Sequence, residues 1–248
     1  MQIKVCDYSH YNYKKEYWQN IDRRYEQLIE TRTLQKLLKL IPNVNTLMDL
    51  GCGFGRLFPC YEHKAENFIL ADYCKDLLKE ARETIKSNKH ILFLNANAYE
   101  LPLVDQEVDL IISIRTLHHF IQPQDLIKEV SRVLKTNGYF IFEIPNKRNL
   151  KQILKFCIKK SKTNPFSEDI YFLNEVFVNF HPKLIKRYLA ENGLIIKKSL
   201  NTSFFRISLF KKIVPLPVLV MLDAACQKLF SFLNLSPSIY LLCQKTGV

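Results

Sequence analysis

The sequence is poor in glycine, methionine and tryptophan, with 6, 3 and 1 of them among 248 residues. Its seven cysteines are scattered without a CxxC pair, which predicts neither a disulfide framework nor a metal site and fits a reducing cytosol. The first residues lack the apolar core of a secretory signal. No run of 18 apolar residues is present, and the longest candidate, 213–222, contains two prolines. These absences predict a cytoplasmic protein without a membrane-spanning helix.

Acidic residues are scarce in the last two fifths of the chain. Residues 1–143 carry 19 basic and 19 acidic side chains, whereas residues 144–248 carry 17 and 5. The formal net charge of +12 therefore lies entirely in the C-terminal part. A neutral region followed by a basic one indicates that the basic part meets an anionic partner.

Strand-like and helix-like segments alternate through the middle of the chain. The expected strands are 46–50, 68–71, 91–94, 110–114 and 139–144, and the expected helices are 14–40, 74–87, 123–135 and 182–192. Two more strands are expected at 194–199 and 239–245. This alternation predicts an α/β fold, a largely parallel sheet with helices on both faces.

Three of the few glycines, Gly51, Gly53 and Gly55, stand together after a short apolar strand. Glycines at such a turn allow positive φ and let a ligand approach the backbone. Dinucleotide sites use the spacing Gly-x-Gly-x-x-Gly, which differs from this one. Asp49, just before the turn, would repel a diphosphate but can accept hydrogen bonds from an ammonium or a hydroxyl group. The pattern therefore favours a nucleoside ligand that carries an amino acid.

This glycine motif resembles motif I of class I S-adenosylmethionine (SAM)-dependent methyltransferases. The resemblance covers residues 42–146 well and 182–200 and 239–245 loosely. It implies a Rossmann-like, seven-stranded, mostly parallel sheet with an antiparallel last strand, and SAM as the cofactor. Residues 1–248 are then expected to form one methyltransferase domain with an N-terminal helical cap at 1–42. Two insertions, 147–180 and 201–236, fall where the family builds its substrate cover.

Further cofactor contacts are implied by segments that resemble the family's other motifs. Asp72 ends an apolar strand about 20 residues after the first loop glycine, the distance expected of a carboxylate that binds a ribose diol. Tyr73 is either a residue that stacks on adenine or an ordinary surface aromatic. Asn97 stands where the family has Asp, and its amide oxygen can still accept from the adenine amine. The implied cofactor residues are Asp49, Gly51, Cys52, Gly53, Gly55, Asp72, Tyr73, Asn97, Ala98, Ile114 and Arg115.

Two histidines, His118 and His119, follow the expected strand 110–114 at the end of the sheet where donor and acceptor would meet. Imidazole titrates near neutral pH, so either side chain is a candidate general base. One histidine of such a pair often serves only to fix the loop. His181, at the start of a later helix, is a comparable candidate. Glu143 and Asn146 stand near the carboxyl end of the expected strand 139–144, within reach of a substrate. A base is optional, because positioning and water exclusion do most of the work in transfer from a sulfonium.

The family members that look most similar include ubiquinone- and menaquinone-biosynthesis enzymes and other small-molecule methyltransferases. The resemblance implies methyl transfer from SAM to a small-molecule or lipid-linked acceptor. The alternatives are an RNA methyltransferase acting on tRNA or rRNA, and a SAM-binding partner subunit without catalysis. The turn after residue 114 lacks both the Asn/Asp-Pro-Pro-aromatic signature and the Pro-Cys pair of base methylation.

The segment 147–162 has helical periodicity, with an apolar stripe beside a stripe of lysines. It is either a lid helix with a solvated lysine face or a basic amphipathic helix at an anionic membrane surface. The aromatic, aliphatic and cationic residues of 204–222 support the second interpretation, which would make the protein peripheral at the membrane. A long hydrophobic substrate tunnel would use the same residues equally well. Nucleic acid is the competing partner. The sequence does not indicate an oligomeric state.

Overall fold

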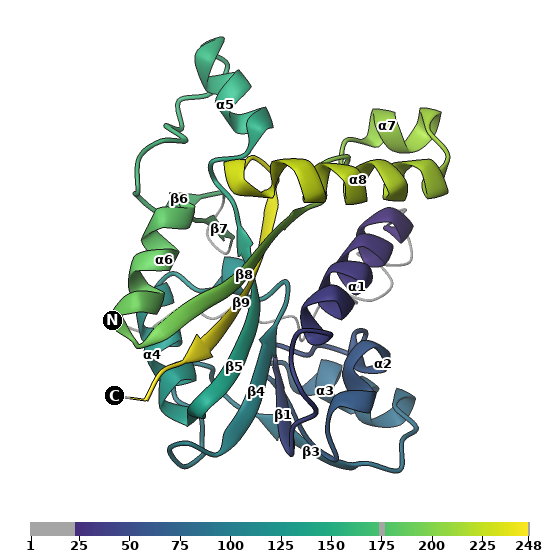
Figure 1. Cartoon of the computed structure of the whole chain (residues 1–248), viewed down its shortest axis with the longest axis vertical. Helices are drawn as coiled ribbons and strands as arrows, with labels where there is room; N and C mark the ends of the chain where they lie inside the picture. Colours follow the sequence, from purple (N-terminus) through teal and green to yellow (C-terminus); the bar gives the residue numbers. More distant parts are fainter. Residues whose placement is uncertain (1–22, 174–176, 248) are drawn as a thin grey trace.

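The computed structural model describes residues 23–173 and 177–247, and its first turn of helix starts at Arg24 (Figure 1). The strands are β1 (Thr46–Leu50), β2 (Asn67–Asp72), β3 (His90–Asn95), β4 (Val108–Ser113), β5 (Leu134–Pro145), β6 (Tyr171–Phe172), β7 (Val178–Asn179), β8 (Leu194–Thr202) and β9 (Ser238–Lys245). The α-helices are α1 (Arg24–Leu38), α2 (Phe58–Tyr61), α3 (Lys75–Thr84), α4 (Pro123–Val133), α5 (Leu150–Cys157), α6 (Pro182–Glu191), α7 (Ser208–Ile213) and α8 (Leu216–Phe230). Short 3₁₀ turns are η2 (Glu62–Lys64), η3 (Leu117–His119) and η4 (Ser231–Leu233).

Seven strands form one sheet in the order β3-β2-β1-β4-β5-β9-β8. The pairs from β3 to β5 are parallel, whereas β9 is antiparallel to both of its neighbours. Parallel pairs need crossover helices, and those helices bury both faces of the central strands. The four residues Leu47–Leu50 of β1 are accordingly buried. The predicted Rossmann-like sheet with an antiparallel last strand is confirmed.

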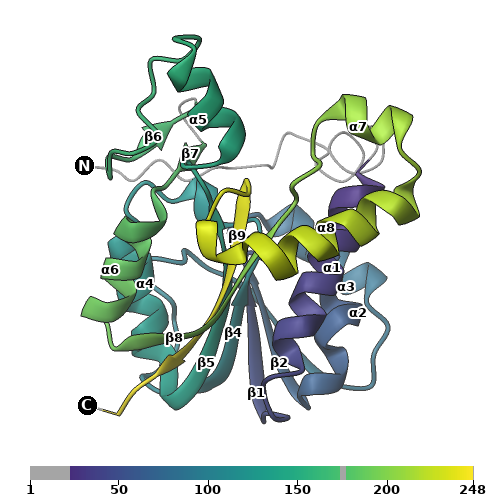
Figure 2. The same cartoon turned by 45° about the horizontal axis from the view of Figure 1, so that its top comes forward.

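Helices cover the two faces of the sheet as separate apolar layers. Leu126 and Ile127 of α4 and Ile185 of α6 pack on one face. Leu37 of α1 and Phe58 of α2 pack on the other, together with part of α3. In Figure 2 the groups α4/α6 and α1/α2/α3 flank the sheet on opposite sides. The helix expected at 14–40 is seen as α1, and residues 14–22 of it lie outside the described residues.

Both expected insertions leave the sheet at the carboxyl ends of the parallel strands, where the glycine turn also follows β1. The first insertion follows Pro145 of β5, which pairs with Ser238 of β9. The second follows Thr202 of β8, which pairs with the same Ser238. Because these three residues lie side by side, α5, α7 and α8 rise from one end of the sheet (Figure 1). Ligands of open α/β sheets bind at this end.

Two expectations about the insertions are wrong in detail. The helix expected over 147–162 spans only Leu150–Cys157, and Lys147 is buried, donating to Ser167 Oγ at 3.0 Å instead of joining an exposed lysine stripe. The apolar run 213–222 was the longest candidate for a membrane span, but the helix that contains most of it continues beyond Leu222 through η4. Among the described residues, Leu216–Leu233 is therefore one helical stretch long and apolar enough to cross a membrane.

Candidate cofactor and active site

The turn after β1 needs its three glycines for different reasons. All three have positive φ, at 81°, 55° and 77°. A Cβ on Gly51 would overlap the Thr116 side chain, and one on Gly55 would come within 2.6 Å of Ile85 Cδ1. A Cβ on Gly53 would instead point into space, with its nearest neighbour 4.0 Å away. Gly51 and Gly55 therefore let the turn pack against the protein, and Gly53 leaves room for a ligand.

The carboxylate of Asp72 ties the end of β2 to this turn. Its Oδ2 accepts from the Gly53 backbone N–H at 2.8 Å, and its Oδ1 accepts from the Cys74 N–H at 2.9 Å. Burial raises the pKa of Asp72, although these backbone donors oppose the rise. Each carboxylate oxygen can accept a further hydrogen bond. Asp72 is thus positioned to accept from ligand hydroxyls beside Gly53.

An open pocket lies above the turn, between β1 and the chain that follows β4. Its lining residues are Asp49, Gly51, Cys52, Gly53, Phe54, Arg56, Leu57, Ile114 and Arg115. Six of the eleven predicted cofactor residues are therefore brought together: Asp49, Gly51, Cys52, Gly53, Ile114 and Arg115. Gly55 has a packing role, and Asp72 reaches the pocket through the Gly53 N–H.

Asp49 is a buried carboxyl group at the floor of this pocket, 3% exposed. It accepts a hydrogen bond from the Tyr61 hydroxyl. Burial, together with the nearby charge of Asp72, raises its pKa to about 7, although the Tyr61 hydrogen bond and the charge of Arg56 oppose the rise. A buried carboxylate near its titration point gains from a cationic partner, which restores the ionised form.

The polar groups of the pocket suit SAM. One carboxylate, Asp49, can face the cationic amino-acid part, and a second, Asp72, can face a ribose diol across the open space at Gly53. Two carboxylates flanking one glycine turn would repel a diphosphate. The residues present therefore fit a nucleoside with a positively charged amino-acid tail, as the sequence predicted.

Binding of SAM is expected to weaken as the pH falls below 7. Protonation of Asp49, whose pKa is about 7, removes the negative charge that favours the cationic ligand, so affinity falls by up to about tenfold per pH unit in the acid limit. Calorimetric titration of SAM at pH 6, 7 and 8 measures this, and Asp49→Asn is the control that lacks the ionisation. An equally steep pH dependence in Asp49→Asn would assign the effect to another group.

The predicted adenine contacts lie along the neighbouring strand end. Tyr73 is 46% exposed, which is compatible with both of its predicted roles. The Asn97 side-chain oxygen accepts from the Tyr99 N–H at 3.1 Å, so part of its hydrogen-bonding capacity shapes its own turn. The Ala96 N–H donates to the Asp72 carbonyl at 3.2 Å, which holds this turn beside Asp72. Tyr73, Asn97 and Ala98 do not line the pocket above the glycine turn, and their adenine contacts remain predictions.

Arg115 and Arg56 share one buried carboxylate that sequence reasoning missed. The Arg115 Nε donates to Glu30 Oε1 at 2.6 Å, and an Arg56 terminal nitrogen donates to Glu30 Oε2 at 2.8 Å. The Glu30 side chain is 2% exposed. Burial alone would raise the pKa of Glu30, but the two guanidinium groups lower it below its ordinary value. Through this carboxylate α1 closes one side of the pocket.

A second buried acid, Glu143 on β5, supports the same wall. Its Oε2 accepts from the Arg115 backbone N–H at 3.0 Å, where Arg115 has a φ of 63°. Its Oε1 accepts from the Ser238 hydroxyl. Tyr240, the partner of Glu143 in the β5–β9 pair, is fully buried and its hydroxyl has no hydrogen-bond partner among the described residues. The position of Glu143 near the carboxyl end of its strand was predictable, but its partners Arg115 and Ser238 were not, because they lie far away in the chain.

His118 and His119 lie in η3, outside the lining of the pocket above the glycine turn. Their rings are 4.0 Å apart between centroids, and Phe177 lies 5.3 Å from the first and 5.1 Å from the second. Burial lowers the pKa of His118 well below its ordinary value, and the charges of His119 and Arg115 lower it further. Burial lowers the pKa of His119 to about 4. Both rings are therefore neutral at pH 7, and their catalytic role stays a prediction.

Two other candidates serve the fold. His181 caps α6, since its Nδ1 accepts from the Lys183 N–H at 3.2 Å. Asn146 is buried and donates through Nδ2 to the carbonyls of Asn234 and Ser236, at 2.8 and 2.7 Å. Within 23–173 and 177–247, no three His, Cys, Asp or Glu side chains are grouped to hold a metal ion.

Comparison with known proteins agrees with this geometry. Residues 48–142 match the methyltransferase domain family Methyltransf_11. The malonyl-[acyl-carrier protein] O-methyltransferase of Marinomonas sp. (strain MWYL1) is 28% identical over 158 residues, which are 60% of this chain and 58% of that protein. The chain spans about three fifths of the length of the first curated relatives that it matches.

Solved structures share the fold. A SAM-dependent methyltransferase structure from Listeria monocytogenes superposes with a TM-score of 0.63 at 19% identity, over 90% of this chain and all of that one. A Haloferax volcanii methyltransferase, solved with the Trm112 methyltransferase activator, gives 0.61 at 14% identity, over 91% and 95% of the two chains. The fold and pocket define a SAM-binding α/β domain. Residues 48–142 match a methyltransferase domain family, the chain shares the fold of SAM-dependent methyltransferases, and S-adenosylmethionine is the cofactor that this family and fold use.

Proposed function

We propose that this protein transfers the methyl group of SAM to a small-molecule or lipid-linked acceptor that enters between the two insertions. One observation carries this proposal: the insertions 147–180 and 201–236 rise from the end of the sheet that bears the glycine turn. Both insertions expose large apolar side chains, such as Leu154 and Met221. An acceptor with an apolar portion suits such an entrance.

The chemistry divides between the cofactor and the protein. When bound, SAM supplies a methyl group on a sulfonium, which is already a good leaving group. Asp49 would hold the amino-acid part of the cofactor and Asp72 its ribose, and the wall made by Glu30, Arg115 and Glu143 would keep the reaction space formed. Positioning of this kind supplies most of the rate enhancement in such a transfer.

The acceptor side of the site is proposed to be the aromatic group of His118, His119 and Phe177. These rings contact one another, and the strand β7 next to Phe177 packs against η3. A neutral imidazole can accept the proton that an acceptor hydroxyl or amine loses, although a lowered pKa makes it a weak base. As a base, the pair is therefore suited to acidic acceptors, whose proton a weakly basic imidazole can take, whereas an acceptor that is already ionised needs no base.

The named relatives support a small acceptor group over a nucleic acid. The Marinomonas protein is named for O-methylation of a malonyl group on acyl-carrier protein. The Haloferax protein, by contrast, was solved with an activator subunit, which keeps an alternative open in which a partner is needed for activity.

Incubation with methyl-labelled SAM tests the proposed acceptor class. Purified protein is supplied in parallel with a lipid extract, a low-molecular-weight metabolite extract and total RNA. Label that appears in the organic or low-molecular-weight fraction supports the proposal, and Asp72→Asn is the matched control with weakened cofactor binding. Label confined to ribonuclease-sensitive material would establish RNA as the acceptor and overturn it. SAM binding by calorimetry without transfer to any fraction would favour the non-catalytic alternative.

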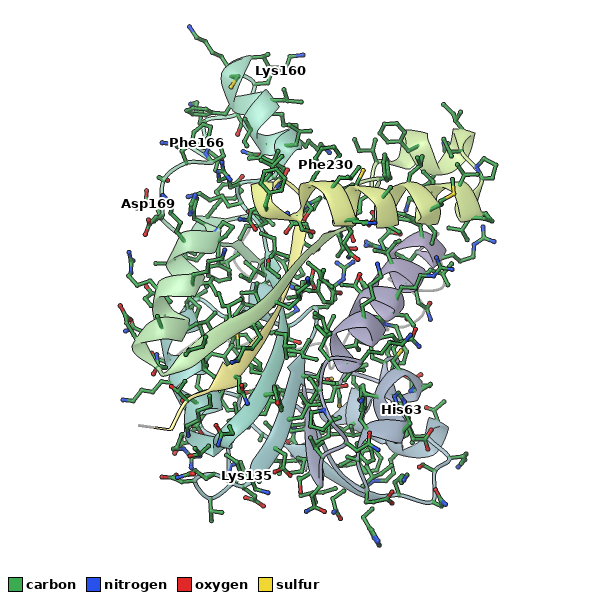
Figure 3. The ribbon with its side chains drawn as sticks, in the orientation of Figure 1. His63, Lys135, Lys160, Phe166, Asp169 and Phe230 are labelled. Atoms are coloured by element: carbon green, nitrogen blue, oxygen red, sulfur yellow. The ribbon has the colours of Figure 1, made fainter. Side chains whose placement is uncertain are left out.

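Substitution of the histidines tests their predicted role. If His118 or His119 accepts the acceptor's proton, His118→Gln or His119→Gln is expected to lower kcat by about 10²-fold or more. The dissociation constant for SAM should stay unchanged, because neither ring lines the cofactor pocket. The surface histidine control is His63→Gln, which is exposed in η2 and lies at the lower right in Figure 3. Unchanged kcat in both variants would limit the pair to fixing the loop.

A further inference from the structure

The helix α8 buries polar side chains and exposes large apolar ones, whereas an ordinary surface helix exposes its polar side chains. Its buried face contains Leu219, Val220, Asp223 and Gln227. Its acidic residue, Asp223, accepts from the Tyr25 hydroxyl of α1 and from Thr202 Oγ1 of β8 at 3.3 Å, and Gln227 donates to Thr33 Oγ1 of α1 at 3.2 Å. The polar side chains thus anchor the helix to α1 and β8.

Large apolar side chains occupy the outward face of the same helix. Met221 is 63% exposed, Leu229 is 59% exposed, and Phe232 in η4 is 76% exposed. These residues recur with Val218 and Leu222 at helical spacing along one side. Soluble proteins rarely expose a contiguous apolar surface of this kind, and such patches mark sites of interaction with proteins or membranes.

The exposed face of α5 continues this surface. The Leu150 N–H donates to the Leu235 carbonyl at 2.8 Å, and Arg148 Nη1 donates to the Leu233 carbonyl at 2.9 Å, so the start of α5 is bonded to the end of η4. No residue of α5 is buried, and Leu154 is 55% exposed. Figure 3 places Lys160, Phe166 and Phe230 at the same end of the molecule.

Cations accompany the apolar residues on this end of the molecule. The exposed lysines are Lys151, Lys155, Lys159, Lys160 and Lys162 around α5, and Lys212 and Lys228 on α7 and α8. Acidic groups are few there. Glu168 is paired with Arg187, Asp223 is buried, and Asp169 is exposed. Aliphatic and aromatic side chains flanked by lysines complement an anionic lipid surface, in which the apolar groups enter the acyl boundary and the lysines meet the phosphates.

We propose that α5, α7, α8 and η4 form a docking surface for an anionic lipid bilayer, on which α8 lies in the plane of the interface. The hydrogen bonds of Asp223 and Gln227 to α1 and β8 keep α8 on the protein, so the helix rests on the membrane instead of crossing it. The cofactor turn lies at the same end of the sheet. A lipid-borne acceptor would therefore meet the site without leaving the membrane, a consequence that rests on the proposed function.

Vesicle flotation of the full chain tests the docking surface without SAM or an acceptor, so its outcome does not depend on methyl transfer. The protein is expected to float with vesicles of phosphatidylcholine and phosphatidylglycerol at low salt, and less with phosphatidylcholine alone or at high salt. Leu229→Ser with Phe232→Ser is expected to lower the partition coefficient by about tenfold or more, since each side chain loses its apolar burial. Lys155→Glu with Lys159→Glu should lower it by about tenfold or more on anionic vesicles only.

Matched controls come from the opposite end of the sheet. Val104, 70% exposed just before β4, supplies the apolar control Val104→Ser, and Lys86, exposed after α3, supplies the charge control Lys86→Glu. Both should float like the unaltered protein, and circular dichroism should show that all variants are folded. Three results would overturn the proposal. The first is that the protein does not float with anionic vesicles at low salt. The second is that the protein does not bind vesicles but forms a dimer, which the Leu229/Phe232 variant dissociates. The third is that the protein binds RNA through these lysines and does not bind vesicles.

Discussion

Replacement of Asp72 by asparagine is expected to weaken SAM binding by about 10- to 100-fold. The carboxylate is positioned beside Gly53 to accept ligand hydroxyls, and hydrogen bonds to a charged group contribute about 1.5–3 kcal/mol each. Asparagine keeps one oxygen for a backbone N–H, so the turn itself should persist. Isothermal titration calorimetry measures the dissociation constant directly.

Asp76, four residues further along and exposed on α3, provides the control. Asp76→Asn removes the same charge from the same region of the chain without touching the glycine turn, and should leave the dissociation constant unchanged. If Asp72→Asn binds SAM as tightly as the unaltered protein does, Asp72 shapes the turn only and the ribose assignment is wrong.

Removal of the Glu30 carboxylate is expected to produce the largest loss of stability, about 3–5 kcal/mol. Glu30→Ala leaves Arg56 and Arg115 without their shared buried partner, with side chains only 11% and 10% exposed. Breaking a buried pair from one side costs this much because the arginine charges stay in the interior without that carboxylate. For a chain of this length the melting temperature should fall by roughly 10 °C in calorimetry or circular dichroism.

An exposed ion pair gives the matched comparison. Glu66 pairs with Lys89 but its side chain is 71% exposed, so Glu66→Ala should change the free energy of unfolding by less than about 1 kcal/mol.

The contribution of Glu30 to stability also depends on pH. Since the pKa of Glu30 is lowered by its arginines, the stability from its ionised form is present above its ordinary pKa of 4.5 and is lost as the pH falls toward the lowered value. A Glu30→Ala variant as stable as Glu66→Ala would contradict the proposed wall.

Much of the cofactor turn was predictable because its determinants are local. The strand 46–50, the glycines at 51, 53 and 55 and the carboxylates of Asp49 and Asp72 lie within 27 residues. Each acts through backbone geometry that its residue type dictates. The mostly parallel sheet was implied by the same local alternation and its antiparallel last strand by the family resemblance, and the structure confirms both.

The wall of the pocket was not predictable in this way. Glu30 meets Arg115 across 85 residues, and Glu143 meets Ser238 across 95. Nothing near Glu30 distinguishes it from a solvated surface residue, and the position of Glu143 at the end of an apolar strand does not identify its partners. Only the packing of α1 over the sheet and the pairing of β5 with β9 make these side chains partners.

The sequence by itself determined the donor side of this protein, since a strand, a glycine turn and two carboxylates at fixed spacing specify a SAM loop. It also showed that the excess positive charge and the apolar segments share the C-terminal part. Only the tertiary structure decided which side of those segments faces the protein and which side faces solvent. Asp223 and Gln227 bond inward to α1 and β8, which turns Met221, Leu229 and Phe232 outward. Which side of an amphipathic helix faces the protein depends on the residues that bind its polar side chains. For α8 these include Tyr25 and Thr33 of α1, which lie almost 200 residues away in the chain.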